Sequence, residues 1–146
     1  MNALKKRGLN QYGKISVGSE VEFASPHRLI QMLMAGALEK IATAKGFMIR
    51  GETAAKGEHI SWAISIIGGL QSSLDMEAGG EIAQNLDDLY AYMVRRLTEA
   101  NLNDDVGGLD EVTSLLLEIK GAWDVMPENV KKASLQTNDT TTAAEL

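Results

Sequence analysis

The distribution of proline is the feature that most constrains the fold of this chain. Its only two prolines, Pro26 and Pro127, bracket a hundred residues that contain none. A helical bundle tolerates such a stretch, whereas a turn-rich β fold rarely shows one. The interval between the two prolines is therefore predicted to be helical.

Capping and turn residues divide this interval into four predicted helices. Ser25-Pro26 supplies an N-cap hydroxyl followed by a proline at the first helical position. The first helix is expected to stop near Gly51, Gly79-Gly80 is interpreted as a C-cap and turn, and a polar turn is expected from Asn101 to Gly108. The predicted helices span about 26–50, 53 or 57 to 74, 80–100, and 105 or 109 to 126. Their short connections favour an all-α fold, an antiparallel four-helix bundle.

Length and composition fit one domain with two flanking segments. The chain has 146 residues, of which 45% are hydrophobic and 23% charged, a globular composition. Residues 1–14 carry four basic side chains and no acid, and the segment from Ser134 onward has almost no core-forming residues. We therefore expect an N-terminal arm over 1–24, the bundle over 25–126 and a flexible, disordered tail over 127–146.

Several classes of function find no support in the sequence. There is no cysteine, and neither His27 nor His59 lies in a Glu-x-x-His pair. In the polar turn after Asn101, Val106 and Val112 occupy the positions at which a calcium loop needs glycine and glutamate. With no nucleophile–base pair and no phosphate loop, the chain is expected not to be an enzyme and to hold no metal or cofactor.

Charge and hydropathy limit the partners. The net charge of −6 argues against nucleic-acid binding, and no apolar run reaches the roughly 18 residues of a membrane span. The N-terminus also lacks the apolar region of a signal peptide. We therefore expect a cytosolic protein with no small-molecule substrate and no membrane insertion.

The apolar residues of the first two predicted helices are spread too widely around the helix axis for a single line of contact with the other helices to bury them all. In the third and fourth helices they occupy an arc of about 140°, but they cover about 200° in the second and more in the first. The surplus is either deeply buried or forms an exposed groove for a partner's amphipathic helix or extended segment. The candidate groove residues are Met32, Met34, Leu38, Trp62 and Ile66.

A collinear set of residues along most of the chain resembles a known family. It comprises Tyr12, Val21, Ala24-Ser25-Pro26-His27, Leu29-Ile30, Met32-Leu33, Gly36-Ala37, Lys56-Gly57-Glu58, Leu74-Asp75, Gly79-Gly80-Glu81-Ile82-Ala83, Asn85-Leu86, Leu89-Tyr90, Tyr92-Met93, Arg95-Arg96-Leu97, Ala100-Asn101 and Trp123. This pattern, which covers about residues 10–125, resembles the FliS family, the flagellar export chaperones that bind flagellin. One departure is Met34-Ala35, where the family usually has an aromatic residue and an aspartate.

The resemblance implies an antiparallel four-helix bundle that binds the C-terminal segment of newly made flagellin in the bacterial cytosol. It implies that this binding prevents premature filament assembly and delivers flagellin to the flagellar type III export gate. It also implies that the segment around Tyr12 can fold against a bundle groove that the client shares. We therefore add Tyr12 and Ile15 to the candidate partner-binding residues.

Two rival functions remain open at this stage. One is a bundle enzyme that binds a metal or a small molecule, and the other is a regulatory bundle that pairs with itself through the same groove. Metal analysis would reveal the first, and sedimentation would show the concentration-dependent dimer of the second.

Overall fold

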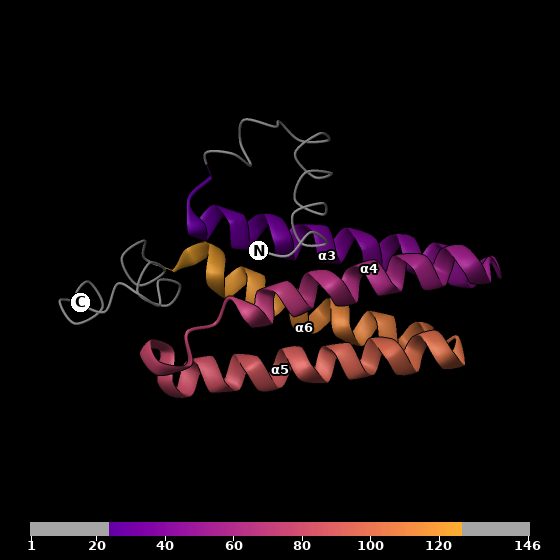
Figure 1. Cartoon of the computed structure of the whole chain (residues 1–146). Helices are drawn as coiled ribbons and strands as arrows, with labels where there is room; N and C mark the ends of the chain where they lie inside the picture. Colours follow the sequence, from indigo (N-terminus) through magenta and orange to yellow (C-terminus); the bar gives the residue numbers. More distant parts are fainter. Residues whose placement is uncertain (1–23, 127–146) are drawn as a thin grey trace.

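The computed structural model describes residues 24–126, and this part of the chain folds into four α-helices without a strand. Their bounds are α3 Pro26–Ile49, α4 Thr53–Ser72, α5 Met76–Asn103 and α6 Val106–Val125 (Figure 1). The prediction of an all-α four-helix bundle is confirmed. The predicted tail and the predicted arm, apart from Ala24, lie outside the described residues.

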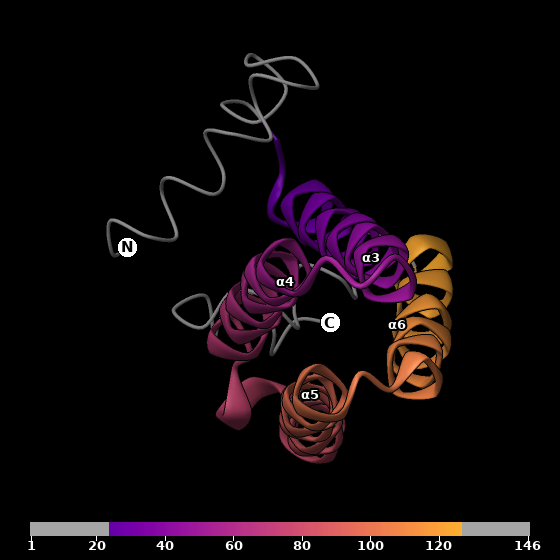
Figure 2. The ribbon, with the colours of Figure 1, turned by 90° about the vertical axis from the view of Figure 1, so that its right-hand side faces the viewer.

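The helices surround a common core, and each packs against two neighbours. Helix α3 contacts α4 and α6, and α5 contacts the same two helices from the other side (Figure 2). Connections of two or three residues join successive helices. Such short connections leave consecutive helices antiparallel.

Residues at the helix ends account for where α3 begins and ends and where α5 begins. The Ser25 hydroxyl accepts a hydrogen bond from the Arg28 amide at 3.1 Å, which caps α3 as predicted. Gly51, which follows α3, has a φ of 75°, a conformation that glycine adopts without strain. One Asp75 carboxylate oxygen accepts from the amides of Glu77 and Ala78 at 3.1 and 3.0 Å, and so begins α5.

The predicted start of the third helix near Gly80 is wrong by about one turn. Helix α5 begins at Met76, and Gly80 lies inside it with non-helical angles, φ 53° and ψ −127°. Because Asp75 satisfies two amides ahead of the glycines, a helical turn forms before them. The glycine marks a kink within the helix rather than its beginning.

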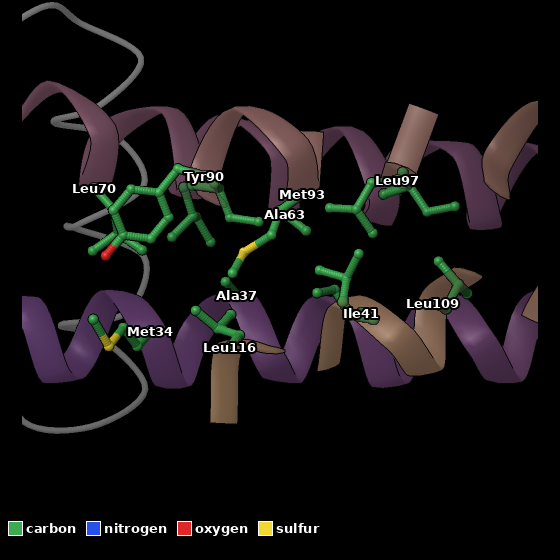
Figure 3. Packing of buried hydrophobic residues seen from close by; sticks show 14 of the residues in the cluster. Met34, Ala37, Ile41, Ala63, Leu70, Tyr90, Met93, Leu97, Leu109 and Leu116 are labelled. Atoms are coloured by element: carbon green, nitrogen blue, oxygen red, sulfur yellow. The ribbon is translucent and has the colours of Figure 1, made fainter. Parts of the chain in front are cut away.

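The core runs the length of the bundle and draws on all four helices. Figure 3 shows Met34, Ala37 and Ile41 of α3 meeting residues of the other three helices across the interior. The largest fully buried side chains are Met34, Ile41, Ile60, Ile67, Leu70, Met93, Leu97, Leu109, Leu116 and Val112. Since α3 packs against both α4 and α6, much of its wide apolar arc is covered from two sides.

A search of the described helices for a stretch long and apolar enough to cross a membrane finds none.

Candidate functional site

Two of the five residues predicted to line an exposed groove are buried. Met34 of α3 is 1% exposed and Ile66 of α4 is 6% exposed, and both belong to the hydrophobic core. At these two positions, deep burial holds of the two alternatives that the sequence left open. Met34 is buried because it shares the inward face of α3 with Ile41, seven residues further on.

The other three are half-buried, but they do not lie along one groove. Leu38 lies seven residues from both Gln31 and Lys45, so the three share one side of α3. Gln31 donates to Asp124 of α6 at 2.6 Å, and Lys45 donates to α6 at 2.8 Å, so Leu38 lies on the side facing α6. Met32 lies on neither that side nor the inward face.

Trp62 of α4 lies at the seam between α3 and α4, where its ring contacts the ammonium of Lys40 of α3. The ammonium of Lys40 is 3.6 Å from the centroid of the Trp62 ring, although Lys40 is only 8% exposed. Leu38 and Trp62 therefore lie on opposite sides of α3. Tyr12 and Ile15, the remaining two predicted residues, lie outside the described part of the chain.

An aromatic row continues from Trp62 along the seam between α3 and α4. The His59 ring is 6.1 Å from the Trp62 ring and 5.1 Å from the Phe47 ring, measured between centroids. We call Lys40, Phe47, His59 and Trp62 the α3–α4 aromatic surface. From the sequence, His59 was considered only as a metal ligand, and it lacks the Glu-x-x-His pairing. The sequence signal for this aromatic row was the spacing of Lys40 and Phe47, which lie seven residues apart and so share one side of α3.

A polar network fixes α6 against α5 near the turn that joins them. Arg96 donates to Glu111 at 2.8 Å and to Asp105 at 3.0 Å, and the Tyr92 hydroxyl donates to the same Glu111 carboxylate. The hydrogen bond from Tyr92, followed by that from Arg96, lowers the pKa of Glu111. Hydrogen bonding from Arg96 likewise lowers the pKa of Asp105.

The opposite end of α6 is held by α3. The Trp123 indole N–H donates to the carbonyl oxygen of His27 at 3.1 Å, and the two rings lie 5.2 Å apart. Hydrogen bonds from Lys120 and then Gln31 lower the pKa of Asp124. The two ends of α6 are thus fixed to different helices.

These surfaces offer apolar and aromatic contact area. Between residues 24 and 126, no group of three or more His, Cys, Asp or Glu side chains is arranged to hold a metal ion. Half-buried apolar and aromatic side chains instead offer area that a partner could bury, and methionine and tryptophan are well suited to such contacts.

Comparison with known proteins identifies the family. The chain matches the family described as Flagellar protein FliS over residues 8–130. It is 52% identical over 118 residues to the flagellar secretion chaperone FliSB of Pseudomonas aeruginosa, which covers 81% of this chain and 94% of that protein. It is 50% identical over 117 residues to the flagellar secretion chaperone FliS of Salmonella typhimurium (80% and 87%), and 48% identical over 119 residues to that of Vibrio cholerae (82% and 88%). The chain therefore belongs to the FliS family of flagellar proteins.

Proposed function

We propose that this protein is a cytosolic export chaperone that binds the C-terminal segment of flagellin. By covering that segment it prevents premature polymerisation, and it delivers flagellin to the flagellar type III secretion apparatus, where the export gate is its second partner. The observation that carries the proposal is the identity of about half the residues with flagellar secretion chaperones over four fifths of the chain.

The apolar surface supports this role physically. Ordering a disordered client costs about 2–5 kcal/mol, so a contact of about 1,000–3,000 Å² is needed to hold it. Because Leu38 lies on the side of α3 that faces α6, and Trp62 belongs to α4 on the other side, a client that contacts both must pass over α3. The proposed contact is therefore extended and crosses more than one seam, instead of filling a single groove.

A polymerisation assay tests the proposal. Light scattering follows filament growth from purified flagellin monomers with and without the full-length protein. We expect the protein to suppress growth at equimolar concentration, and to lose its binding to flagellin from which the C-terminal segment has been deleted. Undiminished growth, or equal binding to the truncated flagellin, would refute the proposed client.

Two glutamate substitutions test whether flagellin contacts the surfaces of α3 and α4. Met32→Glu and Trp62→Glu should weaken suppression, because an unpaired carboxylate would be buried against the apolar client. Ile49→Glu is the matched control, since Ile49 is 66% exposed at the far end of α3. Circular dichroism checks that each variant keeps its helices. Equal suppression of filament growth by all three variants would contradict binding of the client at the surfaces of α3 and α4.

The segment around Tyr12 and Ile15 is proposed to compete with the client for this surface. A free chaperone with a closed population has a lower apparent affinity than one without it. Deleting the first eighteen residues should then raise the affinity for a flagellin C-terminal fragment, measured by calorimetry. An unchanged or lower affinity would contradict the competition but leave the chaperone function standing.

A further inference from the structure

Helices α3 and α5 end in the same kind of turn, but different residues carry it. In both turns an amide donates to the carbonyl oxygen five residues earlier, at 2.9 Å after α3 and at 3.0 Å after α5. The residue in the left-handed conformation is Gly51 after α3, with a φ of 75°, and Asp104 after α5, with a φ of 50°. Glycine adopts this conformation without strain, whereas the Cβ of another residue crowds its own backbone. Of these two turns, the one between α5 and α6 is therefore the strained one.

Two cations hold the connection between α5 and α6 in this shape. The connection consists of Asp104 and Asp105 alone. Buried Lys56 of α4 pairs with the Asp104 carboxylate at 2.6 Å, and half-buried Arg96 of α5 pairs with the Asp105 carboxylate at 3.0 Å. Because the left-handed residue turns the chain back on itself, the two ion pairs keep α6 closed against its own chain.

Away from this connection, α6 is held by α3, which lies far from it in the sequence. Lys45 of α3 pairs with Asp110 at 2.8 Å, and Gln31 of α3 donates to Asp124 at 2.6 Å. Figure 2 shows α6 beside α3, with the connection crossing from α5 to reach it. The completely buried side chains of α6 are Leu109, Val112 and Leu116. None of these contacts requires that α6 belong to the same chain as α3.

We propose that the connection between α5 and α6 is a hinge through which two copies of this chain exchange α6. In the exchanged dimer, α6 of each copy packs against α3 and α5 of the other, so that two complete bundles form. Lys56 and Arg96, which we call the latch, keep a single chain closed. The exchange does not depend on the proposed chaperone function.

A second copy is the occupant that fits the site of an opened α6. When Asp104 leaves the left-handed conformation, α6 moves away from the bundle and exposes its apolar face to water, which is unfavourable. The site that α6 leaves matches the three side chains that it buries there. Another opened chain presents the same site and the same helix, so exchange restores the contacts outside the hinge. It also relieves the strain at Asp104 in both copies.

The latch and the protein concentration decide between the two forms. Opening breaks the ion pairs of Lys56 and Arg96 with the hinge, which favours the closed single chain. The exchanged dimer needs two opened chains, so its fraction rises with protein concentration. The turn after α3 is not expected to open in this way, because Gly51 is unstrained and its opening relieves nothing.

Two substitutions at one position test the hinge. Asp104→Val and Asp104→Gly both remove the carboxylate that Lys56 holds, but only the β-branched residue disfavours a positive φ. This conformation costs a residue with a Cβ about a factor of ten relative to glycine. Each dimer has two hinges, so Asp104→Val should have a dimer association constant about a hundredfold above that of Asp104→Gly. Sedimentation velocity of the full-length variants measures the constant, and equal constants in two helical variants would overturn the hinge.

Isotope mixing tests the exchange in the unmodified protein, and so decides the proposal even if Asp104→Val fails to fold. Labelled and unlabelled full-length chains are mixed, concentrated and separated into monomer and dimer. A carbodiimide then joins the Lys45 ammonium to the Asp110 carboxylate, which lie 2.8 Å apart with side chains 40% and 53% exposed.

Mass spectrometry of the cross-linked peptides gives the result. Peptides that join a labelled Lys45 to an unlabelled Asp110 are expected in the dimer and absent from the monomer. A dimer that contains only same-isotope peptides pairs through its surface, and would overturn the exchange. Absence of a dimer from the concentrated protein would overturn it as well.

Discussion

Replacing Lys56 by methionine is expected to destabilise the fold by about 2 kcal/mol. The Lys56 side chain of α4 is 5% exposed, and its ammonium donates to the Asp104 carboxylate at 2.6 Å and to the Asn101 carbonyl oxygen at 2.9 Å. Asp104 ends α5 in a left-handed conformation, with a φ of 50°. Lys56 therefore connects α4 to the C-terminal end of α5.

The expected loss of about 2 kcal/mol is the contribution of the hydrogen bonds that the substitution removes, less the cost of burying the ammonium that it also removes. Hydrogen bonds to charged groups contribute about 1.5–3 kcal/mol each, so losing two sets the upper range. Methionine also removes the cost of burying an ammonium, and Asp104, whose side chain is 64% exposed, returns to water. The remainder of about 2 kcal/mol corresponds to a fall in Tm of about 10 °C for a domain of this size.

Urea unfolding of the full-length protein, followed by circular dichroism, measures this loss. Lys45→Met is the matched control, because Lys45 bonds Asp110 at a similar 2.8 Å with side chains 40% and 53% exposed. Such an exposed pair should contribute less than about 1 kcal/mol. Equal losses of unfolding free energy in Lys56→Met and Lys45→Met would refute the reasoning that burial gives the Lys56 contacts their value.

Further predictions concern the backbone, pH and the chain ends. Gly80→Ala should destabilise the fold by about 1–2 kcal/mol, because φ is 53° at this position. Gly68→Ala should stabilise the fold by up to about 1 kcal/mol, because an added Cβ meets open space there. Thermal melts of the two variants compare these effects. The lowered pKa values of Asp105, Glu111 and Asp124 mean that their ionised forms stabilise the fold, so unfolding free energy should fall as acid protonates them; a flat acid profile would contradict this. Burial raises the pKa of Tyr90 from 10.0 to about 12, so its stabilising contribution should be lost as pH rises through that interval, an effect absent in Tyr90→Phe. Truncation after Met126, or addition of a chelator, should leave Tm unchanged, and a shift in either would contradict the predicted tail or the absence of a structural metal.

The fold was largely predictable because its signals are local. Ser25-Pro26 marks the start of α3, and the long proline-free interval indicates helices. The start of α5 was missed because two adjacent glycines resemble a helix end, while the decisive contact, the cap from Asp75, depends on how the chain leaves α4.

The candidate site was harder to predict because exposure depends on neighbouring helices. A wide apolar arc does not say which of its sides another helix covers. Met34 proved buried, and Leu38 and Trp62 were separated, because α3 has neighbours on two sides.

Calorimetric titration of a flagellin C-terminal fragment into the full-length protein at several temperatures tests the central claim most directly. The claim is that apolar surface on a helical bundle holds the end of the client, so we expect saturable binding with a negative heat-capacity change. A control fragment of flagellin without its C-terminal segment should give no binding heat. Absence of binding to the C-terminal fragment, or binding with a heat-capacity change near zero, would contradict the account.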